Sequence, residues 1–276
     1  MRQKGLHFLA VDLTDKAALL AVSAQLPERF VLIHMAARVS THSSIDARGV
    51  DEINGAVTMT LNLINVLAGR IAYLCFISSV DVFGNPGGQM VEESHPVNSE
   101  RVYGAAKLMS EHMFLVASQR YGFGLSILRV GHVYGPFEHV ASVTHEGRGR
   151  RMIPSFIRSC LEHKPMIIFG DGQDLRDYVH SYDVAQAILR AVVGGAEGLF
   201  IIASGKSYSV IQIAEMIRKV TGCEQELEMR PRMVPRFDYR FSIAKAQNVL
   251  GYVPTVKMID GLADEVLWTK RVASNG

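Results

Sequence analysis

The chain has 276 residues, of which 48% are hydrophobic, and a formal net charge of +2. A charge this balanced argues against nucleic acid or an anionic membrane as a partner. The sequence has no apolar run of about 18 residues and no signal-peptide pattern at its start, so we expect neither a transmembrane helix nor export. The length predicts one substantial core, in one large lobe or in two unequal lobes.

The three cysteines, Cys75, Cys160 and Cys223, are scattered along the chain. Their number and spacing predict reduced thiols of a cytoplasmic protein. The same spacing gives no support to a metal centre, and we expect none.

The first half of the chain alternates between apolar runs and segments with helical periodicity. Strands are predicted at Leu6–Val11, Phe30–Met35, Ile71–Ile77 and Leu125–Val130, and helices at Asp15–Leu26, Glu52–Leu67 and Val102–Arg120. Strands that are apolar throughout and alternate with helices are typical of a parallel sheet covered on both faces.

The pattern of apolar and polar residues changes after Gly135-Pro136. The polar stretch His139–Arg151 predicts a surface loop. Helices are then predicted at Ile153–His163, Val184–Val193, Ser209–Thr221 and Met258–Val272, and strands at Met166–Phe169 and Leu199–Ala203. We interpret this half as a smaller α/β lobe whose chain weaves back to the larger one.

Tyr103 and Lys107 are four residues apart on one predicted helix, so their side chains share a face. A phenol with a pKa near 10 is a poor base at neutral pH. An ammonium ion about 4 Å away contributes roughly 4 kcal/mol at an effective dielectric of 20, which lowers the phenol pKa by up to about three units before desolvation opposes it. Such a tyrosine can take a hydroxyl proton as hydride leaves the same carbon. A tyrosine and a lysine four residues apart also occur by chance, so the pair alone is weak evidence for a catalytic site.

Ser78-Ser79 strengthens the hypothesis, because these serines follow the predicted strand Ile71–Ile77. Ligands of open parallel sheets bind outside the carboxyl ends of the strands, where a hydroxyl can hydrogen-bond a substrate oxygen. The alternative is a serine that caps a turn. The order of strand, Ser-Ser, turn and a helix that begins with Tyr-x-x-x-Lys is more specific than either part.

Together these motifs resemble the extended short-chain dehydrogenases/reductases, in the nucleotide-sugar epimerase/dehydratase family. The matching stretches are Ala10–Asp15, Val31–Ala37, Phe76–Gly84, Leu128–Pro136, Phe169–Gly172, Arg176–His180 and Leu250–Pro254, with Tyr103 and Lys107 at the expected place. The resemblance implies a Rossmann-like, doubly wound parallel sheet with a smaller C-terminal α/β substrate lobe. Residues 1–136, with a returning segment near 177–195, would form the cofactor domain, and residues 137–176 and 196–276 the substrate lobe.

The same resemblance implies site residues. Catalytic roles fall on Ser79, Tyr103 and Lys107, cofactor contacts on Asp12, Leu13, Met35, Ala36, Ala37, Asn54, Tyr103 and Lys107, and substrate contacts on Ser79, Asp81, His132 and Arg176. Arg176 would pair with a diphosphate, because the guanidinium fork suits phosphate oxygens. The alternatives are that Asp12 or Thr14 caps a helix, that His34 is structural, and that Arg176 pairs with Asp171, Asp174 or Asp177.

The sequence departs from the family pattern in three ways. The family opens with a strand and a Gly-x-x-Gly-x-x-Gly turn that binds the cofactor pyrophosphate, whereas the only early glycine here is Gly5. The sheet is therefore expected to be incomplete at its N-terminal side. His132 stands where the family commonly has asparagine. Asp81 is a single carboxylate where the 4,6-dehydratases generally carry an Asp-Glu pair, which makes epimerisation or simple oxidation-reduction the expected reaction.

The resulting hypothesis is an NAD-dependent epimerase or oxidoreductase of a nucleoside-diphosphate sugar. NADP stays open, because the residue that reads the ribose 2′ position lies in the missing segment. Alternatives are a non-catalytic relative that lacks cofactor, an N-terminally truncated gene product, and a reductase of a non-sugar ketone. The resemblance also implies a homodimer formed through a four-helix bundle, with Met59, Leu63, Met109, Met113 and Val116 as contact or core residues.

Overall fold

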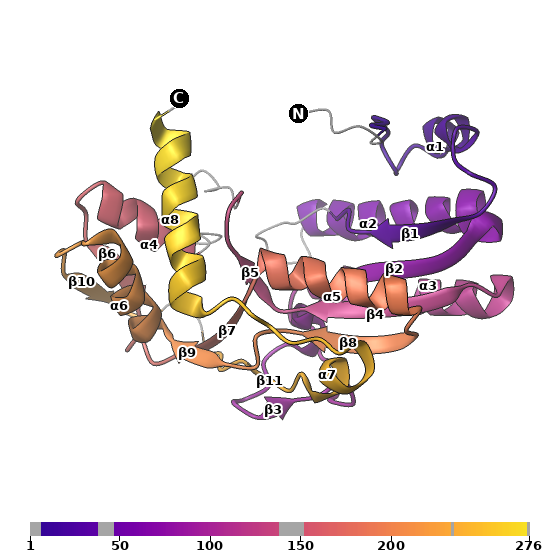
Figure 1. Cartoon of the computed structure of the whole chain (residues 1–276). Coiled ribbons are helices and arrows are strands. Elements are labelled where there is room, and N and C mark those ends of the chain that lie inside the picture. The colour runs from indigo at the N-terminus through magenta and orange to yellow at the C-terminus, as the bar shows by residue number, and fades with distance from the viewer. Residues whose placement is uncertain (1–6, 38–46, 138–151, 233–234, 275–276) are drawn as a thin grey trace.

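The computed structural model describes residues 7–37, 47–137, 152–232 and 235–274 (Figure 1). The helices are α1 (Lys16–Ser23), α2 (Ala47–Leu67), α3 (Val102–Tyr121), α4 (Met152–Leu161), α5 (Ser181–Gly194), α6 (Val210–Thr221), α7 (Ala244–Leu250) and α8 (Met258–Ser274), with short 3-10 turns η1 (Ala68–Arg70) and η2 (Val80–Phe83). The strands are β1 (Phe30–His34), β2 (Ile71–Ser79), β3 (Met90–Val91), β4 (Gly124–Val130), β5 (His132–Tyr134), β6 (Met166–Phe169), β7 (Leu175–His180), β8 (Gly198–Ile202), β9 (Ser207–Ser209), β10 (Leu227–Arg230) and β11 (Arg240–Phe241).

The largest sheet has four strands in the order β1-β2-β4-β8, and every neighbouring pair is parallel. Successive residues of β2 point to opposite faces. Leu74 and Phe76 pack in a core with α1, α2 and α3, whereas Tyr73 and Cys75 pack with α5 and α7. The prediction of a parallel sheet covered on both faces is therefore confirmed.

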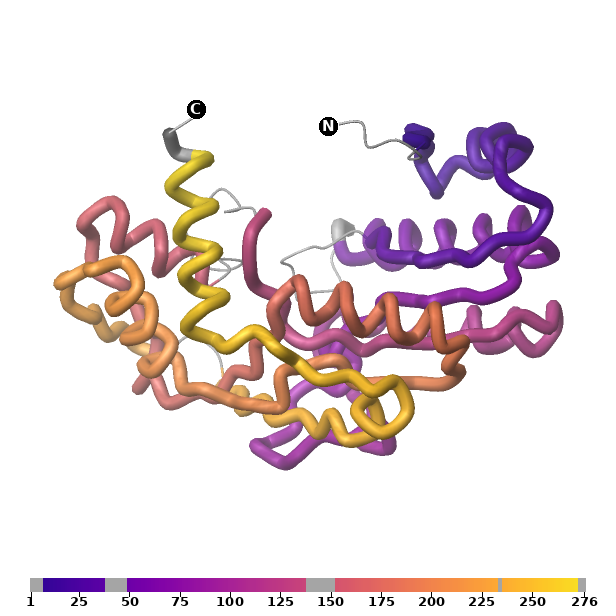
Figure 2. Tube along the Cα trace, in the orientation of Figure 1, coloured from indigo at the N-terminus to yellow at the C-terminus, as the bar shows by residue number. Residues whose placement is uncertain are grey.

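The prediction of a strand at Leu6–Val11 is wrong for the described residues, because residues 7–12 have no strand. No described strand pairs with the outer edge of β1, so these residues have no ladder to join. Side chains of α2 and η1 instead hold the residues that follow this segment. The amide of Asn62 on α2 donates to the carbonyls of Leu13 and Thr14 (2.9 and 3.0 Å), and Arg70 donates to the carbonyl of Ser23 (2.9 Å). Figure 2 shows this segment, in indigo, beyond α2 at the end of the sheet.

The outer edge of β1, which pairs with none of the described strands, is also apolar. Val31 and Ile33 are 46% and 43% exposed, on the same face of the sheet as Tyr73 and Cys75. In a complete doubly wound sheet this face would be covered. Among the described strands, β1 is an edge strand of this sheet.

The smaller lobe packs α4, α6 and α8 around a second core against the parallel pair β10-β6. Ser209 begins α6 with a capping box, in which its hydroxyl accepts from the Gln212 N–H and the Gln212 side chain accepts from the Ser209 N–H. The three-stranded sheet β5-β7-β9 joins this lobe to the large sheet. Figure 1 shows the smaller lobe at the left and the large sheet at the right.

Strand β8 belongs to the large sheet, because it pairs with β4 from Ser126↔Gly198 to Val130↔Ile202. The assignment of residues from 196 onward to the smaller lobe is therefore wrong for β8. The same holds for α7, whose Ala246 and Leu250 pack with Phe200 in the core of the large lobe. Sequence periodicity missed this because strand and helix patterns do not say which sheet they join.

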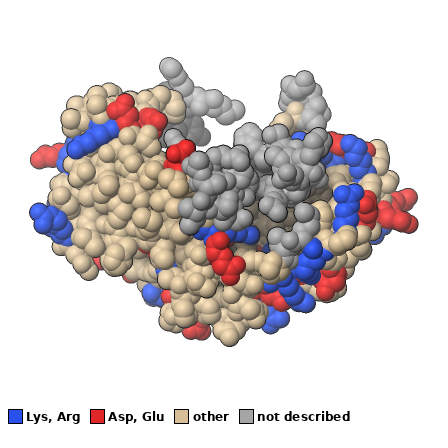
Figure 3. Space-filling model, turned by 180° about the vertical axis from the view of Figure 1, so that it is seen from behind, with Lys and Arg blue, Asp and Glu red and all other residues tan. Residues whose placement is uncertain are grey.

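Two sequence expectations concern the surface. The predicted loop His139–Arg151 lies outside the described residues. No helix in the described part of the chain is long and apolar enough to cross a membrane. Seen from behind, acidic and basic side chains lie close together around the lower and right-hand edges of the molecule (Figure 3).

Candidate active site

The carboxyl end of β2 forms one wall of the site. Ser79 is the last residue of this strand and is half-buried. Its hydroxyl oxygen accepts a hydrogen bond from the Asp81 N–H (3.1 Å), so Ser79 does cap the η2 turn. A hydroxyl can donate while it accepts, so the cap leaves its proton available to a further acceptor.

The start of α3 lies against this turn because residue 104 is glycine. A Cβ atom at Gly104 would lie 2.5 Å from the carbonyl oxygen of Asp81, which no larger residue could accept without a shift of the helix. Arg101, which precedes α3, reaches the Asp81 carboxylate at 3.8 Å. This close approach brings Tyr103 to the end of β2 that carries Ser79.

Tyr103 and Lys107 lie on one side of α3, as their spacing predicts. The Lys107 ammonium is 5.7 Å from the centroid of the Tyr103 ring and 4.9 Å from that of Phe76. It donates a hydrogen bond of 2.7 Å to the carbonyl of Ile77. Lys107 is only 6% exposed. Burial lowers the pKa of Lys107 to about 8, against a smaller raising effect of the Glu111 carboxylate.

A pocket opens beside this pair, between the end of β1 and helices α2 and α3. Its lining includes His34, Ala36, Ala37, Ala56, Tyr103 and Lys107. His34 stacks on Phe76, with the ring centroids 5.5 Å apart. Burial, helped by the charge of Lys107, lowers the pKa of His34 to about 4, so this imidazole is neutral at physiological pH.

The predicted cofactor residues divide into two groups. Ala36, Ala37, Tyr103 and Lys107 line the pocket, whereas Met35 and Asn54 are exposed and do not. Asn54 precedes Ala56 by two residues, about 200° around α2, so it faces away from the pocket. Asp12 and Leu13 lie in the turn before α1.

Asp12 has a local role in that turn. Its carboxylate accepts from the N–H and the hydroxyl of Thr14 (2.8 and 2.7 Å). The cap of α1 is Asp15, whose carboxylate accepts from the N–H groups of Ala17 and Ala18. The sequence-based alternative of a helix cap at Asp12 or Thr14 is therefore wrong, because the adjacent aspartate performs this role.

The three other predicted substrate residues, Asp81, His132 and Arg176, lie together. The His132 ring is 5.0 Å from the Tyr239 ring, and the Arg176 guanidinium lies 5.7 Å over the same ring. Burial lowers the pKa of His132, the charge of Asp81 opposes this, and the charges of Arg176 and Arg101 reinforce it.

Sequence reasoning missed Arg101 and Tyr239 in this cluster. The position of Arg101 directly before the Tyr103 helix was an available signal. Tyr239 had only its setting in an aromatic and basic stretch, Arg236–Arg240.

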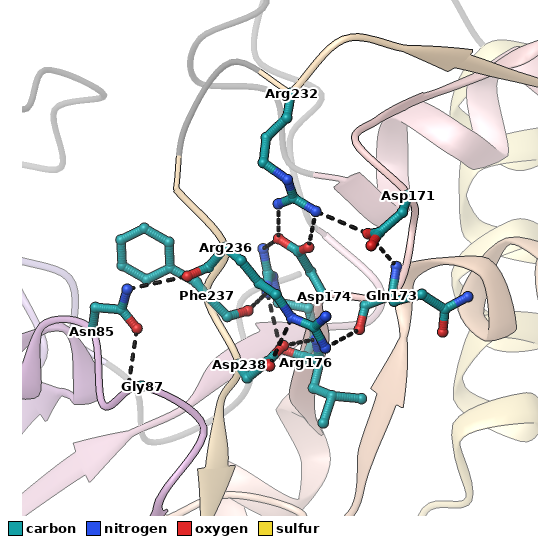
Figure 4. Close-up of polar contacts among 11 residues, drawn as sticks. Asn85, Gly87, Asp171, Gln173, Asp174, Arg176, Arg232, Arg236, Phe237 and Asp238 are labelled. Carbon is teal, nitrogen blue, oxygen red and sulfur yellow. Dashed lines mark hydrogen bonds and ion pairs between the residues drawn. The ribbon is translucent and has the colours of Figure 1, made fainter.

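Arg176 is held by the protein itself (Figure 4). It donates to the backbone carbonyls of Leu175 and Phe237 and contacts Asp174 at 3.4 Å. Arg232 donates one hydrogen bond of 3.0 Å to Asp174, forms a second ion-pair contact with it at 2.8 Å, and also reaches Asp171 at 2.8 Å. The alternative of an Arg176–Asp174 pair is therefore present, while Asp177 accepts instead from the N–H and hydroxyl of Ser204.

Known proteins resemble the chain in sequence and in fold. The model of the NAD dependent epimerase/dehydratase family matches residues 1–202. The UDP-glucose 4-epimerase of Mycolicibacterium smegmatis is 31% identical over 266 residues, which cover 94% of this chain and 82% of that protein. The dTDP-glucose 4,6-dehydratase of Streptomyces niveus is 26% identical over 241 residues, which cover 86% of this chain and 69% of that protein.

In structure, the UDP-glucose 4-epimerase of Thermus thermophilus, solved as a complex with NAD, matches with a TM-score of 0.83 and 25% identity, over 97% of this chain and 86% of that chain. This likeness confirms the Rossmann-like architecture inferred from the motifs. The family match covers most of the chain, and the chain accordingly belongs to the NAD dependent epimerase/dehydratase family.

Proposed function

We propose that this chain catalyses the NAD-dependent epimerisation of a nucleoside-diphosphate sugar. The observation that carries the proposal is that Tyr103 and Lys107 line one pocket, beside the strand end that bears Ser79. Family membership supports the reaction class, since epimerases and dehydratases both occur among the relatives.

The residues of the pocket suit the nicotinamide-ribose end of NAD. Ala36, Ala37 and Ala56 present small apolar side chains to the pocket, and the Lys107 ammonium offers donors to ribose hydroxyls. When bound, NAD supplies the hydride acceptor, and in the return step the hydride donor, at one carbon of the sugar.

The protein supplies the matching proton transfer. Tyr103, as phenolate, takes the proton of the sugar hydroxyl and later returns it. Ser79 donates a hydrogen bond to the same oxygen. Since the pKa of Lys107 is about 8, this side chain is largely an ammonium ion at pH 7, and its charge favours the phenolate.

We assign the sugar nucleotide to the cluster of Asp81, His132 and Arg176. Arg176 would bind the diphosphate by exchanging its contact with Asp174 for phosphate oxygens. We keep the division into a cofactor lobe and a substrate lobe, with β8 and α7 moved to the former.

The test is turnover of sugar nucleotides by the full chain with added NAD in deuterated water, followed by NMR. We expect UDP-glucose or a related sugar nucleotide to give its epimer without deuterium on carbon, because the carbon-bound hydrogen comes back from the cofactor. A 6-deoxy-4-keto product that carries solvent deuterium would identify a dehydratase instead. Failure to bind NAD, measured by calorimetry, would favour a non-catalytic relative.

We also propose a homodimer that pairs α2 and α3 across a two-fold axis. Met109 and Val116 are 44% and 54% exposed and lie seven residues apart on α3, whereas Met59 and Leu63 are buried in the core. Met109→Glu combined with Val116→Glu should convert a dimer into a monomer in sedimentation velocity. The matched control is Val193→Glu on α5, where the valine is 77% exposed, and a wild-type monomer would contradict the proposal.

A further inference from the structure

A charged cluster lies buried behind the pocket, where α3 packs on the ends of β2 and β4. Glu111, Arg129 and Ser78 are 5%, 5% and 3% exposed. Arg129 binds the Glu111 carboxylate through two hydrogen bonds of 3.0 and 2.7 Å. The Ser78 hydroxyl donates to the same carboxylate at 2.5 Å.

The cluster ties three elements together at the end of the sheet. Ser78 and Arg129 face each other in the parallel register of β2 and β4. Glu111 on α3 therefore binds both strands, through Ser78 on β2, which directly precedes Ser79, and through Arg129 on β4. The hydrogen bond from Ser78 to Glu111 also restrains the preceding peptide carbonyl of Ile77, which accepts the hydrogen bond from Lys107.

Glu111 also follows Lys107 by one helical turn, so it lies on the same side of α3. Other titratable or charged groups near Lys107 come from several elements: Tyr103 from α3, His34 from β1 and Arg129 from β4, next to Glu111. His34 is neutral at physiological pH because burial lowers its pKa to about 4. Among the described residues that act on Lys107, Glu111 is the one whose charge favours the ammonium form.

We infer that Glu111 is a positioning residue that fixes the strand end carrying Ser79 and balances the charge of the buried Lys107 ammonium ion. The catalytic consequence rests on the proposed function. The charge balance does not, and it can be measured without turnover.

The test replaces Glu111 by glutamine in the full chain, which keeps the shape and removes the charge. The Lys107 pKa is read from the NMR titration of side-chain signals in protein labelled at lysine, with the Lys107 signal assigned by its loss in Lys107→Met. We expect the Lys107 pKa to fall by about one unit, because an opposite charge one turn away is lost. Glu100→Gln, which removes an exposed carboxylate before the same helix, should leave the Lys107 pKa unchanged.

The single variant leaves Arg129 buried beside a neutral partner and can fail to fold. The double variant Glu111→Gln/Arg129→Met removes both charges and keeps the volume, so it provides the same measurement in a neutral cluster. Loss of the Arg129 charge acts in the opposite direction, so the Lys107 pKa of the double variant is compared with that of Arg129→Met, and we expect it to be lower. An unchanged Lys107 pKa in folded Glu111→Gln, or in the double variant relative to Arg129→Met, overturns the inference.

The pH dependence of turnover separates this inference from the proposed function. Loss of a negative charge lowers the pKa of an ammonium ion and of a phenol alike, so both limbs of the pH–rate profile should move to lower pH. A role in packing alone would lower the rate without moving the limbs. A Lys107 shift in protein that turns over no sugar nucleotide would overturn the proposed function and leave the charge balance in place.

Discussion

Tyr103→Phe is expected to lower kcat for the proposed sugar-nucleotide turnover by about 10²–10⁴-fold, the range for removal of a general base. The phenyl ring keeps the volume and the contact with Lys107 but has no proton to exchange. Binding of NAD and of the sugar nucleotide should change little, since neither needs the phenolic proton. Single-turnover reduction of NAD, followed by absorbance at about 340 nm, separates the chemical step from binding.

Tyr121→Phe is the matched control, because Tyr121 ends the same helix and is 45% exposed. It should retain the wild-type rate. Equal rates for Tyr103→Phe and the wild type would show that another group takes the proton and would remove the basis of the proposed mechanism.

Lys107→Met is expected to lower activity and, at neutral pH, to raise stability. The pKa of Lys107 falls from its ordinary 10.5 to about 8 because the side chain is buried. Holding the charge in the folded state therefore costs about 3 kcal/mol. The hydrogen bond to the Ile77 carbonyl returns about 1 kcal/mol, so the net gain for methionine is about 2 kcal/mol at pH 7.

The sign of the pH dependence follows from proton binding. Between pH 8 and 10.5 the unfolded chain keeps the Lys107 proton while the folded chain has lost it. The free energy of unfolding of the wild type then rises with pH relative to the variant. The advantage of methionine is full below pH 8 and vanishes by about pH 10.5. Urea unfolding at pH 7 and pH 10.5 measures it.

Lys164→Met serves as the control, since its side chain is 68% exposed. We expect a change within about 0.5 kcal/mol at both pH values. A Lys107→Met variant that is less stable than the wild type at pH 7 would mean that the ammonium is stabilised by its surroundings, and the electrostatic account of the site would fail.

Much of the fold could be predicted from periodicity. The segments that became β2, β4 and α3 carry long, unbroken patterns, and their bounds in the structure differ from prediction by one or two residues. Leu6–Val11 has an equally apolar pattern, but a strand needs a partner as well as a composition. A pattern within one segment contains no information about whether that partner is present.

The positions of site residues could be predicted where they depend on neighbours within the same helix or strand. Tyr103 and Lys107 share a helix face by spacing alone, and both line the pocket. Asn54 does not line the pocket, because a shift of two residues along a helix reverses the direction of the side chain. The setting of Arg176 depends on the backbone of Phe237, some sixty residues later, and no local pattern encodes such a contact.

The outer edge of β1, which no strand of the described residues covers, has a consequence for handling the protein. Its backbone N–H and C=O groups lie beside exposed Val31 and Ile33. Such an edge is a template on which another chain can add a strand. The protein is therefore expected to self-associate in a concentration-dependent way. High protein concentration favours edge-to-edge association, which removes active protein from solution without involving the pocket. Rates are therefore best compared at matched, low protein concentration.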